Sequence, residues 1–254
     1  MAYEADNGHV TVERTDGIAT ITLDSGPVNT VDIPLAEDLR EVVAHLETEP
    51  PRVAVLRGAG DTYCAGGDLS QTPEEFIETI DVAYDAIIDI FESDTPYVAS
   101  FKKVAIGGGI EFGVACDLRV AGEETTIAVP EATIGIIPPA GAIRFLAQLV
   151  GIGRARDLLL TGRHITGAEA QRMGLVNRTT DDDPDELARS VAETLASNST
   201  GAMAAMLKSL REAHRRPISS EKWDIDVAAR LADAEDFRRG QEAFRAGESI
   251  DFRE

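Results

Sequence analysis

The sequence predicts an α/β protein in which strands and helices alternate up to about residue 180 and the remainder is helical. Hydrophobic residues make up 43% of the 254 residues, enough for one large core or a core with a small appendage. Short apolar runs such as 97–101 alternate with longer segments of helical periodicity such as 73–93. These observations favour an α/β domain followed by a helical C-terminal region.

The first half of the chain contains the clearest alternation. Residues 9–23 form two alternating runs around Asp16-Gly17, the pattern of a β-hairpin. Residues 34–47 have helical periodicity, and Pro34 is tolerated in the first turn of a helix. The segments that follow are predicted as a buried strand (52–58), a glycine-rich loop (59–70), a helix (73–93), a strand (97–101), the start of a helix (109–116) and two short strands (118–122 and 126–129).

Beyond about residue 140 most segments have helical spacing. The acidic cluster 179–186 is interpreted as a solvated turn and a helix N-terminus. The candidate helices of this half are 140–150, 152–160, 167–173, 184–198, 200–215, 221–234 and 236–246.

The composition is strongly acidic, with 45 Asp and Glu against 24 Lys and Arg and a net charge of −21. Such a chain would repel nucleic acid and anionic membranes, so neither is expected as a partner. No run of eighteen apolar residues predicts a membrane span, and the N-terminus has no apolar signal region. Cys64 and Cys116 lack metal-type spacing, which predicts a reduced cytoplasmic protein without a metal site. The acidic, lysine-poor composition resembles that of halophilic proteins, and an ordinary acidic cytosolic protein is the alternative.

Three consecutive glycines, 107–109, open the helix that carries Glu111. Backbone N–H groups at a helix N-terminus are free to bind an anion, and glycine lets a ligand approach them closely. The dinucleotide pattern G-x-G-x-x-G fails because Phe112 stands at its third glycine, and neither a phosphate loop nor G-x-S-x-G is present. A second glycine loop, "YCAGGDL" (63–69), follows strand 52–58, so one N–H from each loop could form an oxyanion hole.

The ordered motifs resemble the crotonase (enoyl-CoA hydratase/isomerase) family over nearly the whole chain. The resemblance is carried by "RVAVLRGAGDTYCAGGDLS" (52–70), "KKVAIGGGIEFGVACD" (102–117) and "TIAVPEATIGIIPPAG" (126–141). It implies a spiral of ββα units over residues 1–195, which hold the active site. It also implies a helical region over 196–254 that drives assembly into a homotrimer or a hexamer.

The resemblance also implies roles for individual residues. Gly67 and Gly108 match the two oxyanion-hole donors, and Glu111 and Glu131 match the two catalytic glutamates. The remaining matches are residues that bind the coenzyme A thioester: Ala65, whose carbonyl would contact the adenine, and its neighbours Gly66, Asp68 and Leu69. No cofactor is implied beyond the coenzyme A of the substrate. Arg57, Lys102, Lys103 and Arg245 are candidates for a phosphate contact, the last from a neighbouring subunit.

The predicted function is the hydration of a 2-enoyl-CoA. Glu111 is expected to activate the water and Glu131 to protonate C2, with shared or exchanged roles as an alternative. One competing enzyme function is a Δ3,Δ2-enoyl-CoA isomerase. Another is a specialised acyl-CoA hydrolase, decarboxylase or ring-cleaving enzyme, and the unusual loop "PPAGAIR" (138–144) suggests this whole group. A non-catalytic RNA-binding member is a further alternative, against which the net charge argues. Structural interpretations also stay open: a simple turn at 107–109, a buried ion-paired Glu111, and Glu131 as a helix N-terminal acid.

Overall fold

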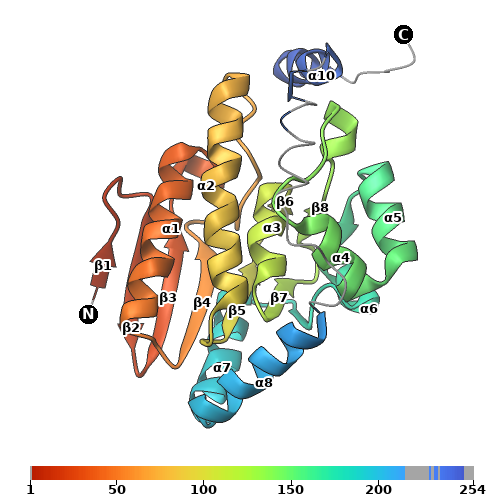
Figure 1. The fold of residues 1–254 in the computed structure, drawn as a ribbon. Coiled ribbons are helices and arrows are strands. Elements are labelled where there is room, and N and C mark those ends of the chain that lie inside the picture. The colour runs from red at the N-terminus through yellow and green to blue at the C-terminus, as the bar shows by residue number, and fades with distance from the viewer. Residues whose placement is uncertain (1, 215–228, 230–231, 234, 249–254) are drawn as a thin grey trace.

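The computed structural model describes residues 2–214, 229, 232–233 and 235–248. Its larger sheet has seven strands in the order β1-β2-β3-β4-β5-β7-β10 (Figure 1). β1 to β3 pair antiparallel, and the remaining pairs are parallel. The strands are β1 (Ala2–Glu4), β2 (Val10–Thr15), β3 (Ile18–Leu23), β4 (Val53–Gly58), β5 (Tyr97–Phe101), β7 (Leu118–Gly122) and β10 (Arg178–Thr180).

A smaller sheet is formed by β6 (Val104–Ile106), β8 (Thr126–Ala128) and β9 (Ile165–Thr166). The chain passes from β5 in the large sheet to β6 in the small sheet and then into helix α3 (Gly108–Ala115). It repeats this path from β7 to β8 and into the short 3-10 helix η2 (Glu131–Ile134). These successive ββα units confirm the predicted α/β, crotonase-like architecture.

Helices cover both faces of the large sheet. α1 (Ile33–Thr48) and α2 (Pro73–Glu92) lie side by side on one face (Figure 1). α7 (Pro184–Ala196) packs on the other face, where Ala188 and Val191 contact the β4 residues Val53 and Val55. Since both faces of β4 are buried, its sequence is apolar without alternation. The other helices whose bounds fall within the described residues are η1 (Gly26–Val28), α4 (Ala142–Val150), α5 (Ile152–Thr161), α6 (Gly167–Met173), α8 (Thr200–His214) and α10 (Glu235–Ala246).

Most predicted elements are present with shifts of one or two residues. The hairpin around Asp16-Gly17 is confirmed, and both turn residues have positive φ angles of 53° and 81°. The strands β1, β6, β9 and β10 were not predicted; β6 intervenes between strand 97–101 and the glycines that open α3. The candidate helix 221–234 lies largely outside the described residues, and the division at residue 195 stays a prediction. In the described part of the chain, no helix is long and apolar enough to cross a membrane.

Candidate active site

The two glycine loops meet at the start of α3. The segment 64–67 runs beside β6, where Cys64 N–H donates to the Val104 carbonyl at 3.2 Å and Ile106 N–H donates to the Cys64 carbonyl at 3.1 Å. A Cβ built on Gly108 would lie 3.8 Å from the amide nitrogen of Gly67. Neither of these two N–H groups has a hydrogen-bond partner among the described residues. Two neighbouring donors are therefore available for one external oxygen.

The glycines on either side of Gly108 are required by the fold around them. Gly107 has a φ of 54°, which disfavours any residue with a side chain, and a Cβ there would lie 3.0 Å from Oε1 of Glu131. A Cβ on Gly109 would lie 2.6 Å from the carbonyl oxygen of Cys64. The glycine triplet is thus more than a flexible turn, because it lets three backbone segments and one acid approach each other.

Glu111 is held in a fixed orientation by the loop before α4. Its side chain comes from α3 and is 3% exposed. Oε1 accepts hydrogen bonds from the N–H of Ala140 at 2.6 Å and from the N–H of Ala142 at 3.3 Å. Ala142 is the first residue of α4, so the positive end of this helix stabilises negative charge at the carboxylate.

Glu131, at the start of η2, is buried in a different way. It is 8% exposed, and its Oε2 has no hydrogen-bond partner among the described residues. Burial without a compensating partner raises the pKa of Glu131 to about 7. This acid can therefore hold or release a proton close to neutral pH.

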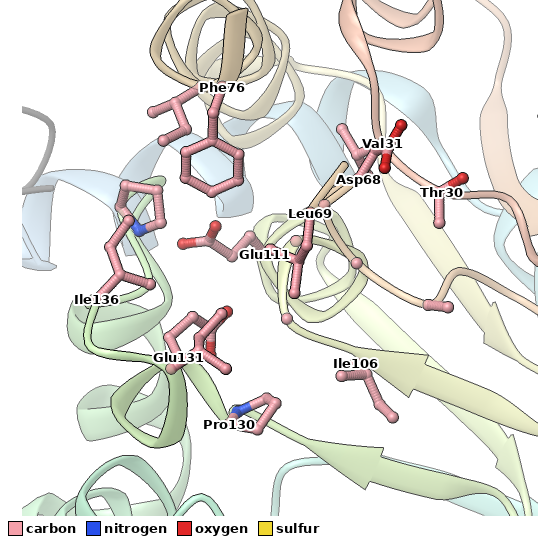
Figure 2. A pocket seen from close by; sticks show the side chains of 18 of the residues that line it. Thr30, Val31, Asp68, Leu69, Phe76, Ile106, Glu111, Pro130, Glu131 and Ile136 are labelled. Atoms are coloured by element: carbon pink, nitrogen blue, oxygen red, sulfur yellow. The ribbon is translucent and has the colours of Figure 1, made fainter. Parts of the chain in front are cut away.

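Both glutamates enter one cavity of about 620 Å³, Glu111 from α3 and Glu131 from η2 (Figure 2). Most of the other lining side chains are apolar, among them Phe76, Ile106 and Ile136. The eight site residues predicted from the sequence all line this cavity: Ala65, Gly66, Gly67, Asp68, Leu69, Gly108, Glu111 and Glu131.

Of the four basic candidates for a phosphate contact, only Arg245 lines the cavity, and it does so from the same chain. Its Nη2 donates to the Leu69 carbonyl at 3.1 Å. Arg57 and Lys102 instead share Asp185, at 3.2 and 2.9 Å. His164 also lines the cavity, although it matches no motif in the sequence.

Two further backbone groups, the N–H groups of Ala140 and Ala142, were not predicted. The only sequence signal for them is Gly141, a plausible start for a helix. In the described part of the chain, no group of three or more His, Cys, Asp or Glu residues could hold a metal ion.

Residues 13–254 match the family described as enoyl-CoA hydratase/isomerase. The chain belongs to this family. Its members, also called crotonases, are enzymes that act on acyl-CoA thioesters.

Relatives and solved structures agree with membership of the enoyl-CoA hydratase/isomerase family. Carnitinyl-CoA dehydratases of Citrobacter koseri and Escherichia coli K12 are each 31% identical, over 81% of this chain and 81% of the relative. An enoyl-CoA hydratase from Bacillus anthracis is 27% identical with a TM-score of 0.78, covering 96% of this chain and 98% of that one. An enoyl-CoA hydratase/isomerase from Mycobacterium paratuberculosis shares the fold at a TM-score of 0.86, with 24% identity over 94% of this chain and 99% of that one.

Proposed function

We propose that this crotonase is an enoyl-CoA hydratase that adds water across the C2=C3 bond of a 2-enoyl-CoA thioester. The proposal rests on two acids that line one cavity and differ in their hydrogen bonding: Glu111 accepts backbone hydrogen bonds, whereas Oε2 of Glu131 has no partner among the described residues. The N–H groups of Gly67 and Gly108 in the same cavity are free to bind the substrate. Hydration needs a base that removes a proton from water and an acid that gives a proton to carbon. Metal or redox chemistry has no part in this proposal.

The proposed reaction begins at the thioester oxygen, which accepts hydrogen bonds from the N–H groups of Gly67 and Gly108. These bonds stabilise the enolate that forms when hydroxide adds at C3. Glu111, fixed by Ala140 and Ala142, takes a proton from the attacking water. Glu131, protonated near neutral pH, gives its proton to C2. Proton exchange with solvent then restores both acids, so the net reaction adds one water molecule.

The nearest competing function is Δ3,Δ2-enoyl-CoA isomerisation, which needs only one general base to move a proton between two carbons. Two acids on one cavity favour hydration, and the dehydratase relatives carry out the same class of reaction in reverse. The deciding assay compares crotonyl-CoA with a 3-enoyl-CoA. Hydration of crotonyl-CoA supports the proposal. Isomerisation without hydration would overturn it.

The raised pKa of Glu131 predicts a loss of activity above pH 7 in both directions of the reaction. Hydration needs the protonated acid, so its kcat/KM should fall about tenfold per pH unit above pH 7. The reaction releases no net proton, so its equilibrium constant is independent of pH and kcat/KM for dehydration should fall in parallel. The measurement is a pH profile of both directions, with Glu131→Gln as control, which should lack the titration near pH 7. Two flat profiles in the native enzyme would refute the assigned role.

The net charge of −21 predicts a dependence on salt, which is the test of the halophilic interpretation. The screening length is ~30 Å at 0.01 M salt and ~3 Å at 1 M, so repulsion between acidic side chains is strong only in dilute buffer. We expect Tm to fall, KM for the polyanionic substrate to rise and the proposed trimer or hexamer to loosen as KCl drops from molar to tens of millimolar. Thermal unfolding, kinetics and light scattering across a KCl series measure the three effects. If Tm, KM and the oligomeric state do not change with KCl, the halophilic interpretation is wrong and the proposed hydratase function is unaffected.

A further inference from the structure

The cavity continues past the two glutamates along one face of α2. Phe76, Ile80, Ala83 and Ile87 all line it, and their spacing of four, three and four residues places them on a single helical stripe. The facing wall includes Phe112, Ile136 and Pro139. The side chains of these seven lining residues are all apolar, and Ile87 and Phe112 are each 1% exposed.

Phe76 marks the level of the reacting carbonyl on this stripe. A Cβ built on Gly67 would lie 3.2 Å from Cε2 of Phe76, so the ring lies against an oxyanion donor. Ala83 is seven residues further along α2, or roughly 10 Å at 1.5 Å per residue. A fully extended chain of single bonds advances about 1.2 Å per bond, so this distance holds about eight bonds beyond the carbonyl.

Ala83 is the smallest side chain on the stripe, and Ile87 follows it one helical turn deeper. The side chain of Ala83 is a single methyl group, so it fills less of the cavity than the larger side chains of Ile80 and Ile87 on either side of it. Any longer side chain at this position would project into the path of an acyl tail. Ile87, whose branched side chain is 1% exposed, lines the cavity one helical turn beyond Ala83.

We propose that the cavity selects an uncharged acyl chain of about eight to ten carbons, with Ala83 setting the length that fits and Ile87 closing the end. The inference deepens the proposed function, since it names the substrate class of the same site. It also separates this chain from the relatives named carnitinyl-CoA dehydratase. Carnitine carries a trimethylammonium group, and burying a cation among apolar walls without a partner is costly.

The test is calorimetric binding of saturated thioesters, which cannot react, to the full chain in molar KCl. Each buried methylene contributes about a fourfold gain in affinity, so octanoyl-CoA should bind on the order of 100-fold tighter than butyryl-CoA. Palmitoyl-CoA should bind no tighter than octanoyl-CoA, and the saturated 4-trimethylammonio-butyryl-CoA no tighter than butyryl-CoA. Equal affinities for butyryl-CoA and octanoyl-CoA would overturn the proposal, as would tight binding of the trimethylammonio thioester.

Substitutions at the α2 residues that line the cavity test which of them sets the dependence of affinity on acyl chain length. Ala83→Phe should remove most of the octanoyl preference, at least about 30-fold, and leave butyryl-CoA affinity within about threefold. Glu78→Phe places the same ring on the exposed face of α2 and should change neither affinity. Ile87→Ala should raise the affinity for palmitoyl-CoA relative to octanoyl-CoA. Where Ala83→Phe does not fold, Ala83→Val should give a smaller loss of the same sign.

These binding results are independent of turnover. If octanoyl-CoA binds as expected and no enoyl-CoA is hydrated, the proposed function fails and the length assignment stands. If crotonyl-CoA is hydrated while Ala83→Phe, folded with a native Tm, keeps full octanoyl preference, the length assignment is wrong and the proposed function stands.

Discussion

Replacing Gly108 with proline is expected to lower kcat for hydration by at least about 100-fold, because it deletes one of the two oxyanion donors. The fold should survive the change. Gly108 is the first residue of α3, a position at which helices tolerate proline, and its N–H donates to no described residue. The measurement is kcat on the best 2-enoyl-CoA together with Tm.

Gly108→Ala is the matched control, since it keeps the N–H. Its Cβ would lie 3.5 Å from Cγ2 of Val31, an ordinary contact, and 3.8 Å from the amide nitrogen of Gly67. Any loss in this variant therefore reports crowding of the oxyanion site. A folded Gly108→Pro enzyme that keeps more than about a tenth of native kcat would show that this N–H does not stabilise the enolate.

Glu111→Gln and Glu131→Gln are each expected to reduce kcat by at least about 100-fold, the scale of general acid–base catalysis. Glutamine is nearly isosteric with glutamate, and its carbonyl oxygen can still accept hydrogen bonds from Ala140 and Ala142. The loss at Glu111 should therefore reflect the missing charge and base. The measurement is single-turnover and steady-state hydration, with Tm as a check of folding.

The double variant distinguishes concerted action from two independent contributions. Because the acids act on one water and one substrate, its loss should be smaller than the product of the two single losses. Glu78→Gln, on the exposed face of α2, serves as the neutral control. Near-native hydration in either single variant would exclude the two-acid mechanism, and an isomerase would tolerate one of the two changes.

Local sequence signals predicted the elements that depend on local geometry. Asp16-Gly17 identifies the hairpin because the turn needs positive φ angles at two successive residues, and few residue types adopt them. Helix α2 was predicted from the helical periodicity of residues 73–93, and in the structure Thr72 and Glu75 form a capping box at its start, with Pro73 in the first turn. Strands β6 and β9, of three and two residues, carry no periodicity of their own. They exist because distant segments pair with them, which no local pattern encodes.

The cavity, too, was predicted only in those parts that local sequence motifs encode. Its two glycine loops and two glutamates were found through ordered motifs, and all of them line one space. The contacts that give the acids unequal character were not predicted. Ala140 and Ala142, which donate hydrogen bonds to Glu111, are 29 and 31 residues away from it in the sequence. The lack of a hydrogen-bond partner for Oε2 of Glu131 among the described residues likewise depends on how distant segments pack around it. Residue types indicated which groups react, whereas their protonation depends on neighbours distant in sequence.

The hydrogen bond from Arg245 to the Leu69 carbonyl joins residues 176 positions apart, and it bears on the order in which the enzyme matures during synthesis. The backbone donors, both acids and the N–H groups that hold Glu111 lie between residues 67 and 142, so they are synthesised well before α10. The helix that brings Arg245 to the cavity emerges near the end of translation. A nascent chain can therefore assemble its reactive centre first and complete the surrounding wall last, as expected when folding proceeds from the N-terminus. The docking of α10 covers one side of Phe76, whose ring centroid lies 5.4 Å from that of Phe237.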